Sequence, residues 1–476
     1  MYIQLVRTLA LVALLATHKT EASAIRVIHE KITVIENVDA RSPPNIIFIL
    51  GDDIGYNDVG WNNPNIQTPH MNKLAKEGVI LDHFYAMPLC TPSRASLLTG
   101  LYAQQLGLQR GVLDFQEPYG VPLKYKFLPQ LLKTRGYHSH ALGKWHLGFC
   151  DWRYTPTYRG FDTFFGFYQG YEENYQHCLS PNYIFDPIIQ GDVFTQQCEN
   201  QPAARREFCG AMIGLDQVVH NITEALKRHN LYDNSIVVFV SDNGGSTTFG
   251  GNNFPLRGNK GSLFEGGTRV PGFINSPLLK KTGYVYSGLF HIVDWYTTFL
   301  HLAGIKPNKN SNLNGVNQWE SVSEDRPSPR TEFPYLMDII EGIKIGAVRV
   351  GDYKLINGPS GGFSDEWTTE NETVDKSYDP NFMTHYDTEI IKAYNLTDLS
   401  PKLYNLAVDP YEKNNLANEE PEKLEELRER FDYYFSIAKP AVKMDADPKG
   451  HPDKFGGIFT SGWCEAYDDV PVIISK

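Results

Sequence analysis

The sequence predicts an α/β fold: a mixed, mostly parallel sheet flanked by helices, followed by a smaller α+β domain with an antiparallel sheet. Two apolar runs at 45–51 and 235–241 each end in acidic or amide side chains, which is typical of strands buried on both faces. A further strand is plausible at 137–143. Segments with the spacing of amphipathic helices alternate with these strands, at residues 69–78, 127–135 and 210–228.

The pattern changes in the last third of the chain. Residues 345–355 and 403–406 read as short antiparallel strands, and residues 420–436 form a charged segment with helical spacing. We therefore expect one large domain over residues 25–330 and a smaller C-terminal domain over residues 331–476.

The composition is that of a folded globular protein. Of the 476 residues, 41% are hydrophobic and 21% are charged, so the chain can bury a large core. Acidic residues outnumber basic ones, and the formal net charge is −12. Sequence-independent binding to nucleic acid requires many cations that neutralise phosphates, so we expect no nucleic-acid partner.

The first 24 residues have the features of a secretory signal peptide. Arg7 supplies a positive charge, residues 9–16 are apolar, and Ala22-Ser23-Ala24 forms an A-x-A cleavage site. A membrane anchor is the alternative, but a bilayer core requires about 20 apolar residues. No later segment has 18 uninterrupted apolar residues, so we expect no transmembrane segment. We expect passage through the secretory pathway to the lysosome or the extracellular space.

An oxidising compartment allows the six cysteines to form disulfides. We expect Cys178 to pair with Cys198, and Cys150 with Cys464, although connectivity cannot be derived from a sequence. Sequons for N-glycosylation, which fit a secreted glycoprotein, begin at Asn221, Asn371 and Asn395.

Oxygen-bearing side chains follow both apolar strands. Asp52 and Asp53 come after the first, and Asp242 and Asn243 come after the second. A single Asp in such a place is usually a helix cap or a turn residue. Two matching strand ends favour a site for Ca²⁺ or Mg²⁺ instead, because hard cations prefer oxygen ligands.

The segment at residues 90–100 reads Cys-Thr-Pro-Ser-Arg-Ala-Ser-Leu-Leu-Thr-Gly. Pro92 suits the first turn of a helix, so Cys90 is expected at a helix N-terminus, where free N–H groups favour an anion. Arg94 adds a positive charge one turn further along. The pattern indicates a reactive residue beside an anion site, and the alternative is a buried structural cysteine or half of a disulfide.

The same segment resembles the sulfatase signature, C-x-P-S-R-x-x-x-L-T-G, at every specified position. The run at 51–60 and the Gly-Gly-Asn-Asn before Pro255 resemble arylsulfatase B-like members in particular. The resemblance implies an alkaline-phosphatase-like fold and hydrolysis of sulfate esters, such as aryl sulfates or sulfated glycans. Further matching runs lie at residues 143–148, 160–162, 241–245, 255–260, 265–269, 351–355, 403–406 and 409–410.

The resemblance also implies a metal and a modified residue. In sulfatases, the signature cysteine is converted to formylglycine by a formylglycine-generating enzyme in the endoplasmic reticulum, which implies this change at Cys90. One divalent ion per chain, Ca²⁺, would be held by Asp52, Asp53, Cys90, Asp242 and Asn243.

Four further residues receive roles from the resemblance. Arg94 and Lys144 would steady the hydrated formylglycine and neutralise sulfate. His146 would take a proton while sulfate leaves the covalent intermediate. Lys260 would contact the ester side and stabilise the leaving oxygen.

The chain departs from the family pattern between about residues 174 and 209. Sulfatases have a helix, a buried strand and a sulfate-binding His in this interval, whereas this chain has only His177, with different neighbours. We expect several tens of residues to be absent, which would leave a gap in the sheet or force its strands to pair anew.

This departure sustains a second hypothesis, a weakened or inactive sulfatase-like glycoprotein. A third is a phosphatase or phosphodiesterase of the related alkaline-phosphatase-like group, whose nucleophile is usually Ser or Thr, and the intact Cys90 signature disfavours it. Within the first hypothesis, N-acetylgalactosamine 4-sulfate is the substrate suggested by the arylsulfatase B-like resemblance.

Overall fold

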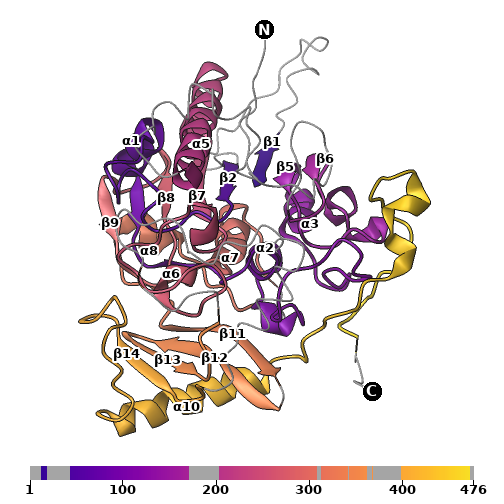
Figure 1. Cartoon of the computed structure of the whole chain (residues 1–476). Helices are drawn as coiled ribbons and strands as arrows, with labels where there is room; N and C mark the ends of the chain where they lie inside the picture. The colour runs from indigo at the N-terminus through magenta and orange to yellow at the C-terminus, as the bar shows by residue number, and fades with distance from the viewer. Residues whose placement is uncertain are drawn as a thin grey trace, which may run out of the picture.

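An eight-stranded mixed sheet, with strand order β6-β5-β1-β2-β7-β8-β3-β9, forms the centre of the larger domain (Figure 1). The computed structural model describes residues 12–18, 43–170, 203–307, 312–340, 342–361, 367 and 398–471. Six of the eight strands point the same way, while β1 and β8 oppose them, which confirms the predicted fold class. The strands are β1 (Val12–His18), β2 (Asn45–Gly51), β3 (Val79–Leu81), β5 (Tyr137–Lys144), β6 (Thr163–Phe167), β7 (Ser235–Ser241), β8 (Gly272–Asn275) and β9 (Tyr284–Tyr286).

Helices cover both faces of β2, which explains why this strand is apolar at nearly every position. On one face, Phe48 packs against the rings of Trp295 and Phe299. On the other, Ile47 and Ile49 join the side chains of α1 and α5. The helices of this domain are α1 (Pro69–Glu77), α2 (Cys90–Thr99), α3 (Leu128–Leu132), α5 (Ala203–Arg228), α6 (Glu265–Thr268), α7 (Asp294–Leu302) and α8 (Trp319–Glu324). A short parallel pair, β4 (Phe84–Tyr85) and β10 (Phe290–His291), lies beside them.

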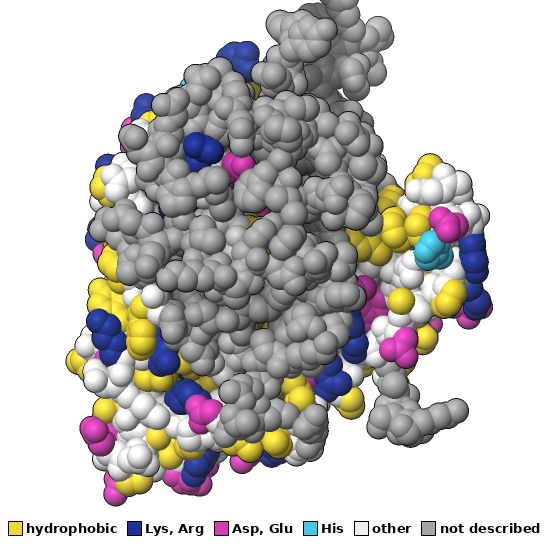
Figure 2. All heavy atoms as spheres, in the orientation of Figure 1, with side chains coloured by type: hydrophobic (Ala, Val, Ile, Leu, Met, Phe, Trp, Pro, Cys, Tyr) yellow, Lys and Arg dark blue, Asp and Glu magenta, His cyan; other side chains and the backbone are white. Residues whose placement is uncertain are grey.

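The smaller domain is a four-stranded antiparallel sheet with one long helix, as the sequence predicts. Leu427 and Phe431 of the helix are buried in one cluster with Val348 and Leu355 of the sheet. Its elements are β11 (Glu332–Ile340), β12 (Ile343–Val350), β13 (Tyr353–Asn357), β14 (Lys402–Asn405) and α10 (Pro421–Ser436). Figure 2 shows charged side chains of both signs interspersed with hydrophobic ones over the described part of one face of the molecule.

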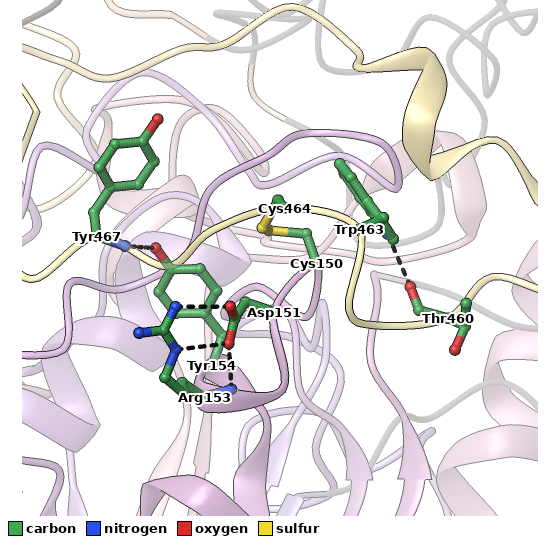
Figure 3. The surroundings of a disulfide bond; sticks show 8 residues. All are labelled: Cys150, Asp151, Arg153, Tyr154, Thr460, Trp463, Cys464 and Tyr467. Atoms are coloured by element: carbon green, nitrogen blue, oxygen red, sulfur yellow. Dashed lines mark hydrogen bonds and ion pairs between the residues drawn. A yellow bond between two sulfur atoms is a disulfide. The ribbon is translucent and has the colours of Figure 1, made fainter.

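The chain beyond α10 returns to the larger domain, although the sequence assigns it to the smaller one. A disulfide joins Cys464 to Cys150, which confirms that predicted pairing (Figure 3). Cys209 also takes part in a disulfide, and Cys90 is the free cysteine of the described residues. The predicted pairing of Cys178 with Cys198 lies outside the described residues.

Two other expectations are only partly covered by the described residues. Asn221 is exposed on α5, while the sequons at Asn371 and Asn395 lie outside the described ranges. Within those ranges, no helix combines the length and the apolar character of a membrane span.

Strand β1 comes from the segment predicted to be a signal peptide. It lies antiparallel between β2 and β5, with Val12 opposite Leu50 and Leu15 opposite His140. Because β2 and β5 run in the same direction on either side of it, β1 occupies an interior position of the sheet. Cleavage after Ala24 would remove β1, so a single molecule cannot both be cleaved there and retain this strand.

A chain that begins at Ile25 tests the contribution of β1. It lacks both ladders of this strand and leaves backbone groups of β2 and β5 without partners, so we expect a lower unfolding temperature and stronger binding of a hydrophobic dye. Calorimetry and dye fluorescence would compare it with the full chain, and mass spectrometry would identify the N-terminus of the secreted protein. Equal unfolding temperatures would mean that β1 adds nothing to the fold.

The two domains meet at a fully buried network of charges. Lys354 of β13 lies between two carboxylates, 3.1 Å from Glu265 of α6 and 2.8 Å from Glu412. Glu412 also accepts a hydrogen bond of 2.7 Å from the backbone N–H of Glu265. Arg349 lies 4.0 Å from Glu265, and Tyr85 donates to the same carboxylate. Buried charges are stable only when paired in this way.

The carboxylates of this network differ in their affinity for protons. Burial raises the pKa of Glu412 to about 7; Lys354 opposes the rise and Glu265 adds to it. Burial would also raise the pKa of Glu265, but Lys354 and Arg349 lower it to about 2. Between the ordinary value of 4.5 and about 7, the folded state holds a proton on Glu412 that the unfolded state has released. This group therefore makes the free energy of unfolding fall as the pH rises through that window.

Glu412→Gln tests this linkage, because glutamine cannot ionise. We expect the variant to lose less stability than the wild type between roughly pH 5 and pH 8, measured by denaturant unfolding. The exposed Glu419→Gln serves as the matched control and should follow the wild type. Parallel curves for wild type and Glu412→Gln would contradict the raised pKa.

Candidate active site

Two adjacent strand ends bring the acidic residues together. Gly51 of β2 is paired with Ser241 of β7, so the residues that follow each strand emerge side by side. The backbone N–H of Asp53 donates to the carboxylate of Asp242, and the Asn243 amide donates to Asp53 at 2.8 Å. Asp53 has a φ of 57°, a left-handed conformation that is uncommon outside glycine and recurs at functional sites.

Helix α2 supplies the central residue. Cys90 is its first residue and is buried, with Sγ lying 3.7 Å from Asp52 Oδ1 and 3.9 Å from Asp53 Oδ1. The prediction that Cys90 stands at a helix N-terminus is therefore confirmed. Burial raises the pKa of its thiol to about 12, although Lys144 opposes the rise, so the unmodified side chain is a neutral thiol and a poor nucleophile.

Three cations neutralise the three carboxylates. Arg94, one turn along α2, forms ion pairs with Asp52 at 3.2 Å and with Asp242 at 2.8 Å. Lys144, at the end of β5, lies 2.6 Å from Asp52. Lys260 lies 2.7 Å from Asp53. The site therefore contains three acidic and three basic side chains, and each basic side chain forms an ion pair with at least one of the acidic ones.

The two aspartates that Arg94 bridges have opposite pKa shifts. Burial alone would raise the pKa of Asp52, but Lys144 and Arg94 lower it well below its usual range. Burial raises the pKa of Asp242 to about 7, with the neighbouring Asp52 carboxylate adding to the rise. The cations therefore favour the ionised form of Asp52, whereas burial and the neighbouring carboxylate favour the protonated form of Asp242.

His146 follows β5 in a left-handed conformation, with a φ of 59°. The ring is buried, and Nε2 lies 3.2 Å from the carbonyl oxygen of Leu113. Nδ1 has no hydrogen-bond partner among the described residues. Burial, together with the charges of Lys144 and Arg94, lowers the pKa of His146 well below its ordinary value, so the ring is neutral. Thr91 donates to the His146 carbonyl at 2.9 Å and connects this turn to the start of α2.

The donor set fits a divalent metal ion. Oxygen or sulfur atoms of Asp52, Asp53, Cys90 and Asp242 lie within 4.8 Å of one another. Asn243 Oδ1 is buried and accepts no hydrogen bond from the described residues, so its lone pairs are available to a ligand. Such an oxygen-rich set suits Ca²⁺ or Mg²⁺.

The structure brings together all the residues that the sequence singles out. Their charged and polar atoms are in contact, except that His146 reaches the cluster through Thr91. Sequence reasoning missed Thr91 and Leu113, which hold His146 in place. Glu265 and Lys354 lie in runs that match the family, but no local pattern indicates that they pair, because they are 89 residues apart in the chain.

The chain belongs to the sulfatase family. A family model described as Sulfatase matches residues 44–187 and 181–305. Arylsulfatase J of Mus musculus is 35% identical, over 88% of this chain and 80% of the relative. N-acetylgalactosamine-6-sulfatase of Homo sapiens is 29% identical, over 79% of this chain and 82% of the relative. These similarities identify a sulfuric ester hydrolase.

Solved structures agree with this assignment. The crystal structure of Ps i-CgsB in complex with k-i-k-neocarrahexaose superimposes with a TM-score of 0.67 and 26% identity, over 86% of this chain and 96% of the other. A second structure, PsFucS1 sulfatase from Pseudoalteromonas sp., has a TM-score of 0.64 and 22% identity, over 85% and 92% of the two chains, which supports the fold.

Asp242→Asn tests the cation site. The change removes one of three clustered carboxylates, so we expect Ca²⁺ affinity to fall by about 100-fold or more, since affinity follows the charge of the ligand set. Isothermal titration calorimetry on protein stripped with a chelator measures this directly. Asp162→Asn, which alters a surface ion pair with Lys133, is the control and should bind as the wild type does. Unchanged affinity in Asp242→Asn would place the ion elsewhere.

Proposed function

We propose that the chain hydrolyses sulfate esters of the aryl sulfate or sulfated glycan class, with one Ca²⁺ and a formylglycine made from Cys90. The observation that carries the proposal is that Cys90 contacts Asp52 and Asp53, two of three clustered carboxylates that are paired with three cations. Names of the relatives, which include an arylsulfatase and a galactosamine sulfatase, support the substrate class. We propose N-acetylgalactosamine 4-sulfate as the substrate, by analogy with the arylsulfatase B-like members that the sequence resembles.

Charge explains why such a site would hold sulfate. With all three carboxylates ionised, the six side chains are neutral as a set, and a bound Ca²⁺ would add two positive charges that offset the charge on the nonbridging sulfate oxygens. Arg94 and Lys144 are held rigidly by their carboxylate partners and cost little reorganisation when the anion binds. The site residues are largely buried, so these attractions are weakly screened by water.

The reaction also requires an oxygen nucleophile, a stabilised leaving oxygen and a base that accepts a proton when sulfate is released. Formylglycine, formed at Cys90, would as its hydrate supply the hydroxyl that the neutral thiol does not, and would allow one difficult displacement to be divided into two easier ones. Lys260 stabilises the oxygen of the departing alcohol. His146, neutral and with Nδ1 as its unprotonated nitrogen, accepts a proton when sulfate is released.

An internal deletion is the main reason for a second hypothesis, a weakened or inactive sulfatase. The alignment with Arylsulfatase J spans 487 positions, more than the 476 residues of the chain, so the relative has segments that this chain lacks. The two parts of the family match also meet at residues 181–187, inside the interval where the sequence predicts the loss. His177 lies outside the described residues.

The proposed function also requires secretion of the chain and modification of Cys90. We propose entry into the secretory pathway through the signal peptide, action of a formylglycine-generating enzyme on Cys90, and delivery to the lysosome or the medium. The Cys150–Cys464 disulfide supports an oxidising compartment.

Turnover of a chromogenic aryl sulfate by the secreted protein, with mass spectrometry of the Cys90 peptide, tests the function. We expect formylglycine at position 90 and turnover that is lost in Cys90→Ala, which removes the nucleophile. The exposed Lys454→Ala is the control and should retain activity. Formylglycine without turnover would reject the enzyme hypothesis and favour the inactive one.

A further inference from the structure

The segment after α10 lies along the larger domain as a strap, residues 439–464. Figure 1 shows it leaving α10 and rising beside the larger domain. Its backbone N–H groups at Lys439 and Val442 donate to Gln104 and Gly107 of that domain. The strap then contacts the chain on both sides of His146, through two separate sets of bonds.

The first contact is with the loop at residues 112–117. Lys443 Nζ lies 2.9 Å from Asp114 and 3.3 Å from the buried carboxylate of Glu117. The N–H of Met444 donates to the same Glu117 side chain at 3.0 Å. A lysine and a backbone amide of the strap therefore fix this loop through one buried carboxylate.

The loop in turn holds the His146 ring. The carbonyl of Leu113, the second residue of the loop, is the hydrogen-bond partner of His146 Nε2. The N–H of Leu113 donates to Thr91 Oγ1 at 3.2 Å, and Thr91 donates to the His146 carbonyl. Ring and backbone of His146 thus share one hydrogen-bonded unit with the first turn of α2.

The second contact lies on the other side of His146. Cys464 is bonded to Cys150, four residues after His146 (Figure 3). The N–H groups of Gly462 and Trp463 both donate to the Cys150 carbonyl, at 2.7 and 3.1 Å. The turn that carries His146 is therefore anchored to the strap by a covalent bond and two hydrogen bonds.

This arrangement favours one of the two neutral tautomers of the His146 ring. A carbonyl oxygen can only accept, so Nε2 must carry the proton when it bonds to Leu113, and Nδ1 is left as a free base. We propose that the strap, through Lys443, Glu117 and the Cys150–Cys464 disulfide, positions His146 and fixes it in the Nε2–H tautomer. The proposal rests on the proposed role of His146 as proton acceptor, and Lys443 and Glu117 are positioning residues.

Two readouts test it, on variants of the strap and of the loop that the strap contacts. One contact is weakened in each of three variants, Lys443→Met, Glu117→Gln and Cys464→Ser. Two controls accompany them: Lys443→Arg retains the positive charge, and Lys454→Ala changes an exposed strap residue outside both contacts. Long-range ¹H–¹⁵N spectra of histidine-labelled protein report the tautomer, with the signals of His146 assigned by their loss in His146→Gln. Turnover of the aryl sulfate gives kcat and KM separately.

The wild type should show the Nε2–H tautomer. Lys443→Met and Cys464→Ser should mix the tautomers and lower kcat by roughly 10- to 100-fold, the usual effect of losing an orienting partner, with KM within about twofold. Lys443→Arg and Lys454→Ala should match the wild type. Glu117→Gln, which retains the size of the side chain and an acceptor oxygen, gives a milder loss if a stronger variant fails to fold.

A wild-type Nδ1–H tautomer, or an unchanged tautomer in folded Lys443→Met and Cys464→Ser, would overturn the proposal, whatever happens to kcat. Absence of turnover in the wild type would reject the proposed function alone, because the spectra test the strap without any substrate.

Discussion

Crowding of three carboxylates at two adjacent strand ends is the constraint on which the site depends. The in-register pairing of β2 with β7 leaves Asp52, Asp53 and Asp242 no means of separating, and the full burial of Asp242 makes an unpaired charge there unfavourable. Arg94, Lys144 and Lys260 come from three other segments and each contacts one or two of these acids. The fold around the site therefore has to bring α2, the end of β5 and the loop with Lys260 to one point.

Connections from the smaller domain and the strap maintain that arrangement. Glu265 is held by Lys354 of the smaller domain, and the next residues of α6 pack against the turn after β7, where Gly244 donates to Gly267 at 2.9 Å. A Cβ on Gly244 would lie 1.9 Å from the Gly266 carbonyl, so this approach requires glycine. The domain interface thus supports the turn that carries Asp242, and the strap supports the loop and the turn that hold His146.

The parts of the fold and of the site that could be predicted from the sequence are those with a local pattern. Strands such as 45–51 and helices such as 210–228 have clear periodicity, and the acidic strand ends and the Cys90 segment are contiguous motifs. Three features depended on distant pairings with no local signal: the strap, the buried pairing of Lys354 with Glu265, and the role of Leu113. The N-terminal segment was ambiguous for a physical reason, because a short apolar run suits both a signal peptide and an interior strand.

We propose that this charge set becomes a sulfate site when a divalent cation is bound. Calorimetric titration of inorganic sulfate into the wild-type protein, once saturated with Ca²⁺ and once stripped with a chelator, measures that coupling without depending on turnover. Since the bound ion would change a neutral set into one with two positive charges, we expect sulfate to bind at least about tenfold more tightly to the Ca²⁺-loaded protein. Equal sulfate affinity in the two states would contradict the account.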